Sequence, residues 1–231
     1  MFTFKFKRIS FYSGSYFEIK NIIKKGGYLV APAASALVNI TKDKKYYTSL
    51  LKSDVAILDS GFFCILLRIF KKYKIIKLSG YLFLSRFIRE YNNKDKLFLI
   101  NPSIKEDKIN NKYILDQNIK KIKSYVAPIY KKIDDKELIK KIKLFRPRYI
   151  IINLGGGIQE PLALYIKNQI NFKSSILCTG AAIAFLTKQQ APINKIVDRI
   201  YLGWFVRLLW NPKKNYKRVF DSLKLINHFL K

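Results

Sequence analysis

Cysteine and histidine are nearly absent from this chain. Cys64 and Cys178 are its two cysteines, both within apolar runs, and His228 is its single histidine. Because there is no CxxC pair, the sequence predicts neither a cysteine-rich zinc site nor a disulfide scaffold. Such cysteine usage is typical of a cytosolic protein in a reducing compartment.

The sequence also lacks a long apolar run and a recognisable leader. Its most apolar stretches are interrupted by Asp59 and Arg68 or end at Gly180, well short of the roughly 20 apolar residues that a spanning helix needs. The first residues, MFTFKFKRISF, interleave charge with aromatic rings and contain no continuous apolar region. We therefore expect neither a membrane-spanning helix nor a signal peptide.

Acidic residues are scarce, with 15 Asp and Glu against 45 Lys and Arg, for a net charge of +30. This sign favours phosphates, anionic lipid headgroups or nucleic acid as partners. The magnitude is less informative, because Lys, Ile, Asn, Tyr and Phe are abundant together, as an A+T-rich genome produces without selection on charge. Most lysines are scattered singly or in pairs, as on ordinary solvated helix faces.

Apolar residues make up 49% of the 231 residues, which is enough for one sizeable core. Short apolar runs alternate with helical patterns, and this alternation predicts a Rossmann-like α/β fold with a mostly parallel sheet. Composition shifts only near Pro192, which divides a core (1–191) from a basic, amphipathic helical appendage (192–231). The strands expected include 54–61, 75–80, 96–103 and 149–157, and residues 1–26 form either a hairpin around Ser13-Gly14 or a loose arm.

Ligands of parallel α/β sheets bind beyond the carboxyl ends of the strands, so the residues that follow each apolar run are the candidates for a site. Asp59 ends one such run and could act as a general base, or could instead be a turn residue or the N-cap of the next helix. Ser35 follows an earlier run, and Thr179, Gly180 and Ala181 follow the last one.

A glycine loop, Gly155-Gly156-Gly157, precedes a helix expected to begin near Gln159. Its backbone N–H groups and the positive end of the helix could hold a diphosphate, or the glycines could serve only a tight connection. Gln159 and Glu160 could bind sugar or ribose hydroxyls, or merely cap exposed amides.

The C-terminal segment mixes cations with aromatic residues. Such a mixture suits a helix on an anionic membrane surface, and its cations could equally bind a diphosphate, although a helix packed on the core is the plainer alternative. No RNP pattern, zinc finger or helix-turn-helix supports nucleic acid as the partner. The cations of interest include Arg199, Arg207 and Arg218.

Two stretches carry a resemblance to a known family. The segments GGGIQEPLALYIKNQI and CTGAAIAFLTKQQAPINKIVDRIYLGWFVRLLWNPKKNYKRVF resemble the second half of the WecG/TagA/CpsF family of bacterial glycosyltransferases. That family reads approximately GxPxQE, FLxGxxxxAP and LxWxxRL, with a basic close. APAASAL, KSDVAILDSGFFCILLRIF and IIKLSG resemble its first half, so the likeness covers roughly residues 28–220 in one order.

The resemblance implies an inverting transferase on the inner face of the bacterial plasma membrane. Its donors would be UDP-sugars, including those of N-acetylmannosamine, its uronic acid or a related hexose, and its acceptors polyprenyl-diphosphate-linked glycans. Asp59 matches the family's proposed base, and Gln159 and Glu160 match its QE pair. Arg207 lies in the family's C-terminal arginine-bearing segment, which is proposed to bind the acceptor's diphosphate. From their places after the strands and in the basic tail, we expect Ser35, the glycine loop and residues 179–181 at the donor, and Arg199 and Arg218 at the acceptor diphosphate. The chain could also form a homo-oligomer.

The sequence departs from the family pattern at several positions. Ile158 replaces the lysine before QE, Ile183-Ala184 replaces a Phe-Asp pair, Gly203 replaces a glutamate, and Ser60 is inserted between acid and glycine. With these changes the chain resembles an exopolysaccharide-type branch of the family more than the teichoic-acid one. Because family residues are lost, a non-catalytic partner in polysaccharide assembly is the second alternative. A basic nucleic-acid-binding protein is the third alternative. Because no DxD motif or metal cluster is visible, we expect catalysis without a metal or other cofactor.

Overall fold

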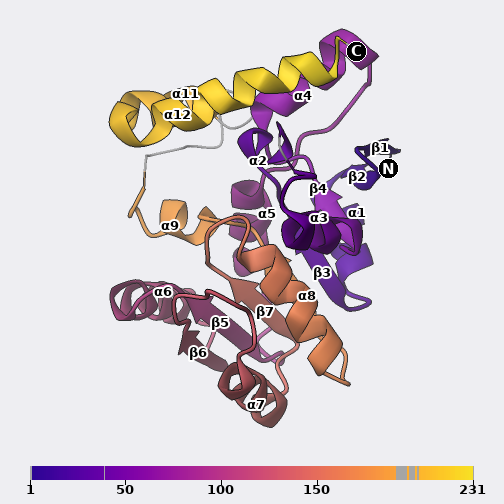
Figure 1. Cartoon of the computed structure of the whole chain (residues 1–231). Coiled ribbons are helices and arrows are strands. Elements are labelled where there is room, and N and C mark those ends of the chain that lie inside the picture. Colours follow the sequence, from indigo (N-terminus) through magenta and orange to yellow (C-terminus); the bar gives the residue numbers. More distant parts are fainter. Residues whose placement is uncertain (1, 39, 191–196, 198–200, 202, 231) are drawn as a thin grey trace.

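The computed structural model describes residues 2–38, 40–190, 197, 201 and 203–230. The described strands form one sheet in the order β1-β2-β4-β3-β8-β7-β5-β6, with helices on both faces (Figure 1). All neighbouring strands are parallel except β1 and β2, which confirms the predicted Rossmann-like α/β fold. The strands are β1 (Phe2–Phe6), β2 (Ile9–Ser13), β3 (Gly27–Val30), β4 (Val55–Ile57), β5 (Leu97–Asn101), β6 (Ile122–Val126), β7 (Tyr149–Ile152) and β8 (Ser175–Cys178).

Most of the longer helices begin at a serine or aspartate that caps the first turn. The side chain accepts a hydrogen bond from a backbone N–H that has no partner inside the helix. These caps are Ser15 of α1 (Tyr16–Ile23), Asp43 of α3 (Lys44–Leu51), Ser60 of α4 (Gly61–Lys71), Ser79 of α5 (Gly80–Arg89), Ser103 of α6 (Ile104–Asp116) and Asp135 of α7 (Lys136–Phe145). The remaining helices are α2 (Ala34–Val38), α8 (Gln159–Gln169), α9 (Ala182–Leu186), α11 (Gly203–Trp210), α12 (Pro212–Leu223) and the 3₁₀ helix η1 (Lys224–His228).

The sheet is buried on both faces, which explains why its strands read as continuous apolar runs. Alternate residues of one strand enter opposite cores: Tyr28 and Val30 of β3 pack with α2, α3, α4, α7 and α8, whereas Leu29 packs with α1, α5, α6 and α9. Two hydrophobic cores thus hold a single sheet and fix its carboxyl edge.

The N-terminal hairpin differs from the turn expected at Ser13-Gly14. β1 and β2 pair as a hairpin, but Lys7 and Arg8 make the turn, with φ angles of 47° and 66°. The Lys7 Nζ donates to two carbonyl oxygens at the end of α2, at 3.1 and 2.8 Å. A tertiary contact therefore supports a left-handed turn that has no glycine or asparagine to signal it.

The prediction of a strand over residues 75–80 is wrong. This segment connects α4 to α5 without joining the sheet. The Ile76 backbone N–H donates to the Ser13 Oγ at 2.7 Å, and Leu78 is buried beneath it. Its apolar residues are therefore those of a buried connection, which a short apolar run does not distinguish from a strand.

The C-terminal helices lie across one end of the molecule in Figure 1, above the carboxyl edge of the sheet. The predicted boundary between residues 191 and 192 lies outside the described residues. Beyond α12 the chain returns to the core, where Leu225 and Phe229 are buried. The Phe229 ring stacks on Phe6 with 5.7 Å between ring centroids. This final segment therefore attaches the C-terminal end of α12 to the core.

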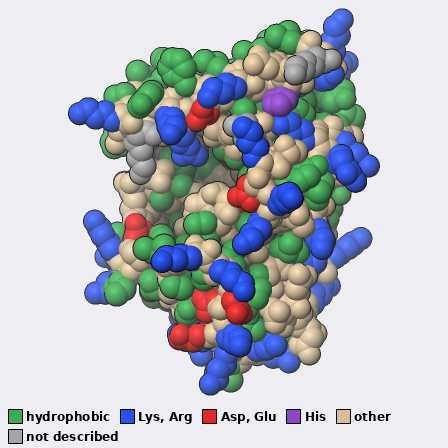
Figure 2. Space-filling model, viewed as in Figure 1, with side chains coloured by type: hydrophobic (Ala, Val, Ile, Leu, Met, Phe, Trp, Pro, Cys, Tyr) green, Lys and Arg blue, Asp and Glu red, His purple; other side chains and the backbone are tan. Residues whose placement is uncertain are grey.

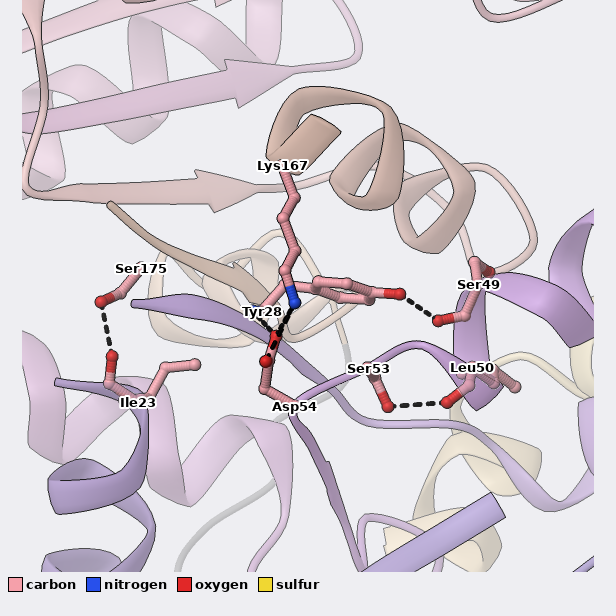
Figure 3. A network of polar contacts seen from close by, with 8 residues as sticks. All are labelled: Ile23, Tyr28, Ser49, Leu50, Ser53, Asp54, Lys167 and Ser175. Atoms are coloured by element: carbon pink, nitrogen blue, oxygen red, sulfur yellow. Dashed lines mark hydrogen bonds and ion pairs between the residues drawn. The ribbon is translucent and has the colours of Figure 1, made fainter. Parts of the chain in front are cut away.

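A polar network ties the opposite, amino edge of the sheet together (Figure 3). The Asp54 carboxylate accepts the Tyr28 N–H at 2.8 Å and pairs with the Lys167 Nζ of α8, also at 2.8 Å. Gly27 has a φ of 98°, and an added Cβ there would collide with this carboxylate. Asp54 therefore has a structural position, far along β4 from the candidate site.

Candidate active site

A cavity lies at the carboxyl edge of the sheet, beneath α12. Its walls come from the segment after β3, from the loop after β4, from the start of α5 and from α12. The molecular surface is hollowed below the C-terminal helices on the face shown in Figure 2. Side chains or backbone from Ala33, Ala34, Ser35, Asp59, Ser60, Gly61, Phe62, Lys77, Ser79, Tyr81, Gly203, Asn215, Arg218, Val219, Ser222 and Leu223 line the cavity.

Asp59 lies where two helices begin. It directly precedes Ser60, the N-cap of α4, and its Oδ1 accepts the Gly80 N–H of α5 at 2.8 Å. The first turns of both helices carry partial positive charge, which stabilises a carboxylate there. Asp59 is half-buried and lines the cavity, so its carboxylate is held in one orientation at the cavity wall.

Close packing requires a glycine at position 61, two residues after Asp59. An added Cβ at this position would collide with the Tyr201 carbonyl, so only glycine lets the two backbones approach this closely. The Tyr201 ring also lies 4.7 Å from the Arg68 guanidinium of α4, within range of a cation–π contact. These contacts bring the chain just before α11 against the loop that carries Asp59.

The glycine loop lies between β7 and α8, as expected, and two buried side chains hold it. The Glu160 carboxylate accepts the Gly157 N–H at 2.8 Å and the Gln159 Nε2 at 2.9 Å. The Gln159 Oε1 accepts the Gly180 N–H at 3.0 Å, which ties the loops after β7 and β8 together. The structure thus shows the capping alternative for this pair, whose contact with a donor stays a prediction.

Gly155 and Gly156 are exposed, and nothing lies within 4 Å of a Cβ added at Gly155. The loop backbone is therefore open to a ligand on one side, while Gln159 and Glu160 support it on the other. Burial raises the pKa of Glu160 to about 7, which outweighs the hydrogen bonds that lower it.

Two buried polar atoms at this edge lack hydrogen-bond partners among the described residues. They are the Thr179 Oγ1 after β8 and the Asn153 Oδ1 after β7. The two strands are neighbours, so both atoms lie at the same part of the edge. Buried polar atoms are normally satisfied, and these two offer unused acceptor or donor capacity close to the glycine loop.

The structure places the predicted residues in two groups. Asp59, Ser35 and Arg218 line one cavity although they are far apart in the sequence. The glycine loop, Gln159, Glu160 and residues 179–181 form a second group, along the carboxyl ends of β7 and β8. Gly80 links the groups, because it donates to Asp59 and packs against the Thr179 carbonyl.

Two of the predicted acceptor arginines are not located. Arg199 lies outside the described residues, and Arg207 belongs to α11 but its side chain is not among those described. Conversely, sequence reasoning missed several residues of the cavity. Lys77 was missed because residues 75–80 were predicted to form a strand. Asn215 and Ser222 belong to no motif that would indicate a site. A lysine two residues before the N-cap of α5 was the available clue.

The described ranges contain neither a membrane-spanning helix nor a cluster of metal ligands. No helix there is both long and apolar enough to cross a bilayer. Likewise, no three side chains among the described histidines, cysteines, aspartates and glutamates converge as metal ligands.

Comparison with known proteins gives one strong match. A family model described as "Glycosyl transferase WecG/TagA/CpsF family" matches residues 3–231, nearly the whole chain. No curated protein matches the chain.

Proposed function

The chain belongs to the WecG/TagA/CpsF family and is a glycosyltransferase of polysaccharide biosynthesis, and we propose that it moves a sugar from a UDP-sugar to a polyprenyl-diphosphate-linked acceptor. The observation that supports this most is the shared cavity of Asp59 and Arg218. A carboxylate and a cation that are 159 positions apart in the sequence line the same cavity, as a base and an anion-binding group require.

In this proposal Asp59 is the general base of a single displacement. Its carboxylate takes the proton from an acceptor hydroxyl, the hydroxyl oxygen forms a bond to the anomeric carbon, and the bond from that carbon to UDP breaks. Attack opposite the leaving group inverts the anomeric configuration. The hydrogen bond from Gly80 orients Asp59 before the substrate binds, which lowers the cost of reaching this geometry.

We assign the two diphosphates to the two groups of residues. The donor diphosphate would contact the exposed amides of the glycine loop and the start of α8, with Thr179, Gly180 and Ala181 beside it. The acceptor diphosphate would contact Arg218, with Lys77 on the other wall of the cavity. Arg199 and Arg207 stay predictions for the same role.

These cations and helix N-termini can neutralise the leaving diphosphate, so we propose catalysis that needs no metal. Asp59 itself lies between the N-termini of α4 and α5 and accepts the Gly80 N–H, so the positive ends of both helices face its carboxylate. In this proposal the positive N-terminal ends of the helices stabilise negative charge on both Asp59 and the bound phosphates.

The family departures bear on which sugar is used. Gly203 lines the cavity that Asp59 also lines, so a glycine without a side chain stands at the cavity wall where the family has a glutamate. Ile158 precedes α8 without a capping hydrogen bond from its side chain, so the loop lacks the usual lysine cation near the donor. We propose N-acetylmannosamine, its uronic acid or a related hexose as the transferred sugar.

We also propose a peripheral location on the cytoplasmic face of the plasma membrane. α11 and α12 expose apolar and basic side chains together, including Leu209, Trp210, Phe220, Lys213 and Lys217. Such surfaces bind anionic bilayers without crossing them.

Transfer of radiolabelled sugar from a panel of UDP-sugars to a lipid-diphosphate acceptor tests the function. We expect transfer from one or a few donors, and unchanged activity in EDTA. Absence of transfer from every donor in the panel would contradict the proposed chemistry. Loss in EDTA that manganese restores would contradict metal independence alone.

A further inference from the structure

An exposed apolar patch lies at the end of α4, away from the cavity. Ile69 and Phe70 of α4 and Leu230 near the C-terminus are 63%, 38% and 68% exposed. The rings of Phe70 and Phe229 lie 5.8 Å apart, so α4 and the C-terminal turn meet here. We call Ile69, Phe70 and Leu230, with the adjacent Lys71 and Lys72, the α4 patch.

The segment that carries most of the α4 patch has charge of one sign. Residues 61–77 contain five lysines and arginines and no acid. Apolar side chains surrounded by cations suit a layer of anionic phosphates above hydrocarbon, where the rings and branched chains enter and the lysines stay at the headgroups. A protein partner would need acidic residues arranged around an apolar surface to match this patch. An anionic bilayer offers negative headgroups above hydrocarbon over its whole surface.

The α4 patch lies at one end of a layer whose other end is also apolar. In Figure 1 the turn between α11 and α12 is at the far left of this layer, and the C-terminus is at its right. Leu209 and Trp210 are exposed beside that turn. α12 spans most of the distance between the two ends, and its 12 residues correspond to about 18 Å.

We propose that the α4 patch is a second membrane contact, which together with the end of α11 lays this layer flat on an anionic phospholipid surface. The inference rests on the proposed function at a membrane and adds a contact made by the core helix α4. One contact would let the protein tilt in any direction, whereas two contacts separated by the length of α12 restrict its tilt to rotation about the line that joins them. The cavity, directly beneath α12, then stays at a constant depth below the headgroups.

Co-sedimentation of the full chain with vesicles of phosphatidylglycerol and phosphatidylcholine tests the proposal. The variant I69D/L230D changes two exposed residues of the α4 patch, and L209D/W210D changes two at the other end. The matched control is I129D/L144D, which introduces the same charge at residues that are 98% and 80% exposed near α7, at the opposite end of the molecule.

We expect I69D/L230D to reduce partition by at least about tenfold, because two carboxylates replace apolar contacts near anionic lipid. The control should stay within about twofold of the unmodified chain, since its charges lie beyond the roughly 10 Å screening length from the surface. Equal melting temperatures of all variants show that folding is preserved. Wild-type partition by I69D/L230D, or an equal loss by the control, would overturn the proposal.

A soluble, short-chain diphosphate acceptor separates this inference from the proposed function. I69D/L230D should transfer sugar to that acceptor at the wild-type rate, because the α4 patch lies outside the cavity. If the unmodified chain transfers nothing to any acceptor, the proposed function fails while the vesicle result still decides on the patch. If only L209D/W210D loses vesicle binding, the patch fails and the proposed function stands.

Discussion

At the scale of single residues, three carboxyl groups have different roles because their surroundings differ. Asp59 lies in a cavity wall at two helix starts, where a substrate can reach its carboxylate. Asp54 accepts a backbone N–H and pairs with a lysine at the amino edge. Glu160 is buried against a glycine loop, and no cation of the described part of the chain pairs with it. Position in the sheet thus decides which of these acids is available to a substrate.

Glu160 should make the stability of the protein depend on pH. Its folded pKa of about 7 exceeds its ordinary value, so the folded state binds a proton more tightly than the unfolded state does. The free energy of unfolding therefore falls as pH rises through this window, by about 2 kcal/mol between roughly pH 5.5 and 8. Glu160→Gln should lack this component, which urea unfolding at several pH values measures.

The comparison concerns the pH dependence and not the absolute stability. Glutamine accepts one hydrogen bond fewer, so the Glu160→Gln variant loses some stability at every pH. The titratable groups around Glu160 include Tyr28, Tyr46 and Cys178, whose own pKa values are raised by burial and stay outside the window. Parallel pH profiles for the variant and the unmodified chain would show that Glu160 does not titrate there.

At the scale of elements, α12 covers the cavity, and its rotation about its own axis determines which of its cations face the substrate. Arg218 lines the cavity, whereas its neighbour Lys217, also exposed, does not. Adjacent helical residues point about 100° apart, so the two cations carry equal charge in different directions. They form a matched pair for testing whether direction matters.

Arg218→Ala should raise the KM for a short-chain lipid-diphosphate acceptor about tenfold or more, because a charge-assisted hydrogen bond is lost. Lys217→Ala removes the same charge and should change KM by less than about twofold. Steady-state kinetics in detergent-free buffer measures both without a membrane. Equal effects of the two substitutions would mean that only net charge matters, which contradicts the assigned position of α12.

The sequence predicted the residues at the carboxyl edge of the sheet better than the residues that cover the cavity. Asp59 and the glycine loop could be found because a buried strand and its following loop have a local signature. Lys77 was missed because the buried connection over 75–80 is as apolar as a strand. The approach of Tyr201 to Gly61 depends on packing between residues 140 positions apart, which no local pattern encodes.

At the scale of the whole molecule, the chemistry and the proposed membrane contact lie on the two sides of one layer. α12 lines the cavity with Arg218 and Ser222, and exposes Phe220 and Tyr216 on its other side. A lipid-linked acceptor would therefore have a short path from the bilayer to Asp59. The final segment, with Phe229 buried against Phe6, anchors this layer to the core.

The central claim is that Asp59 is the base, and sugar transfer by paired aspartate variants tests it most directly. Asp59→Asn keeps an oxygen that can accept the Gly80 N–H, so we expect an unchanged melting temperature and a loss of roughly 10²- to 10⁴-fold in kcat. Asp54→Asn weakens the pair with Lys167, so it should cost about 1 kcal/mol of stability and leave kcat unchanged. Transfer by Asp59→Asn at the wild-type rate would contradict the account.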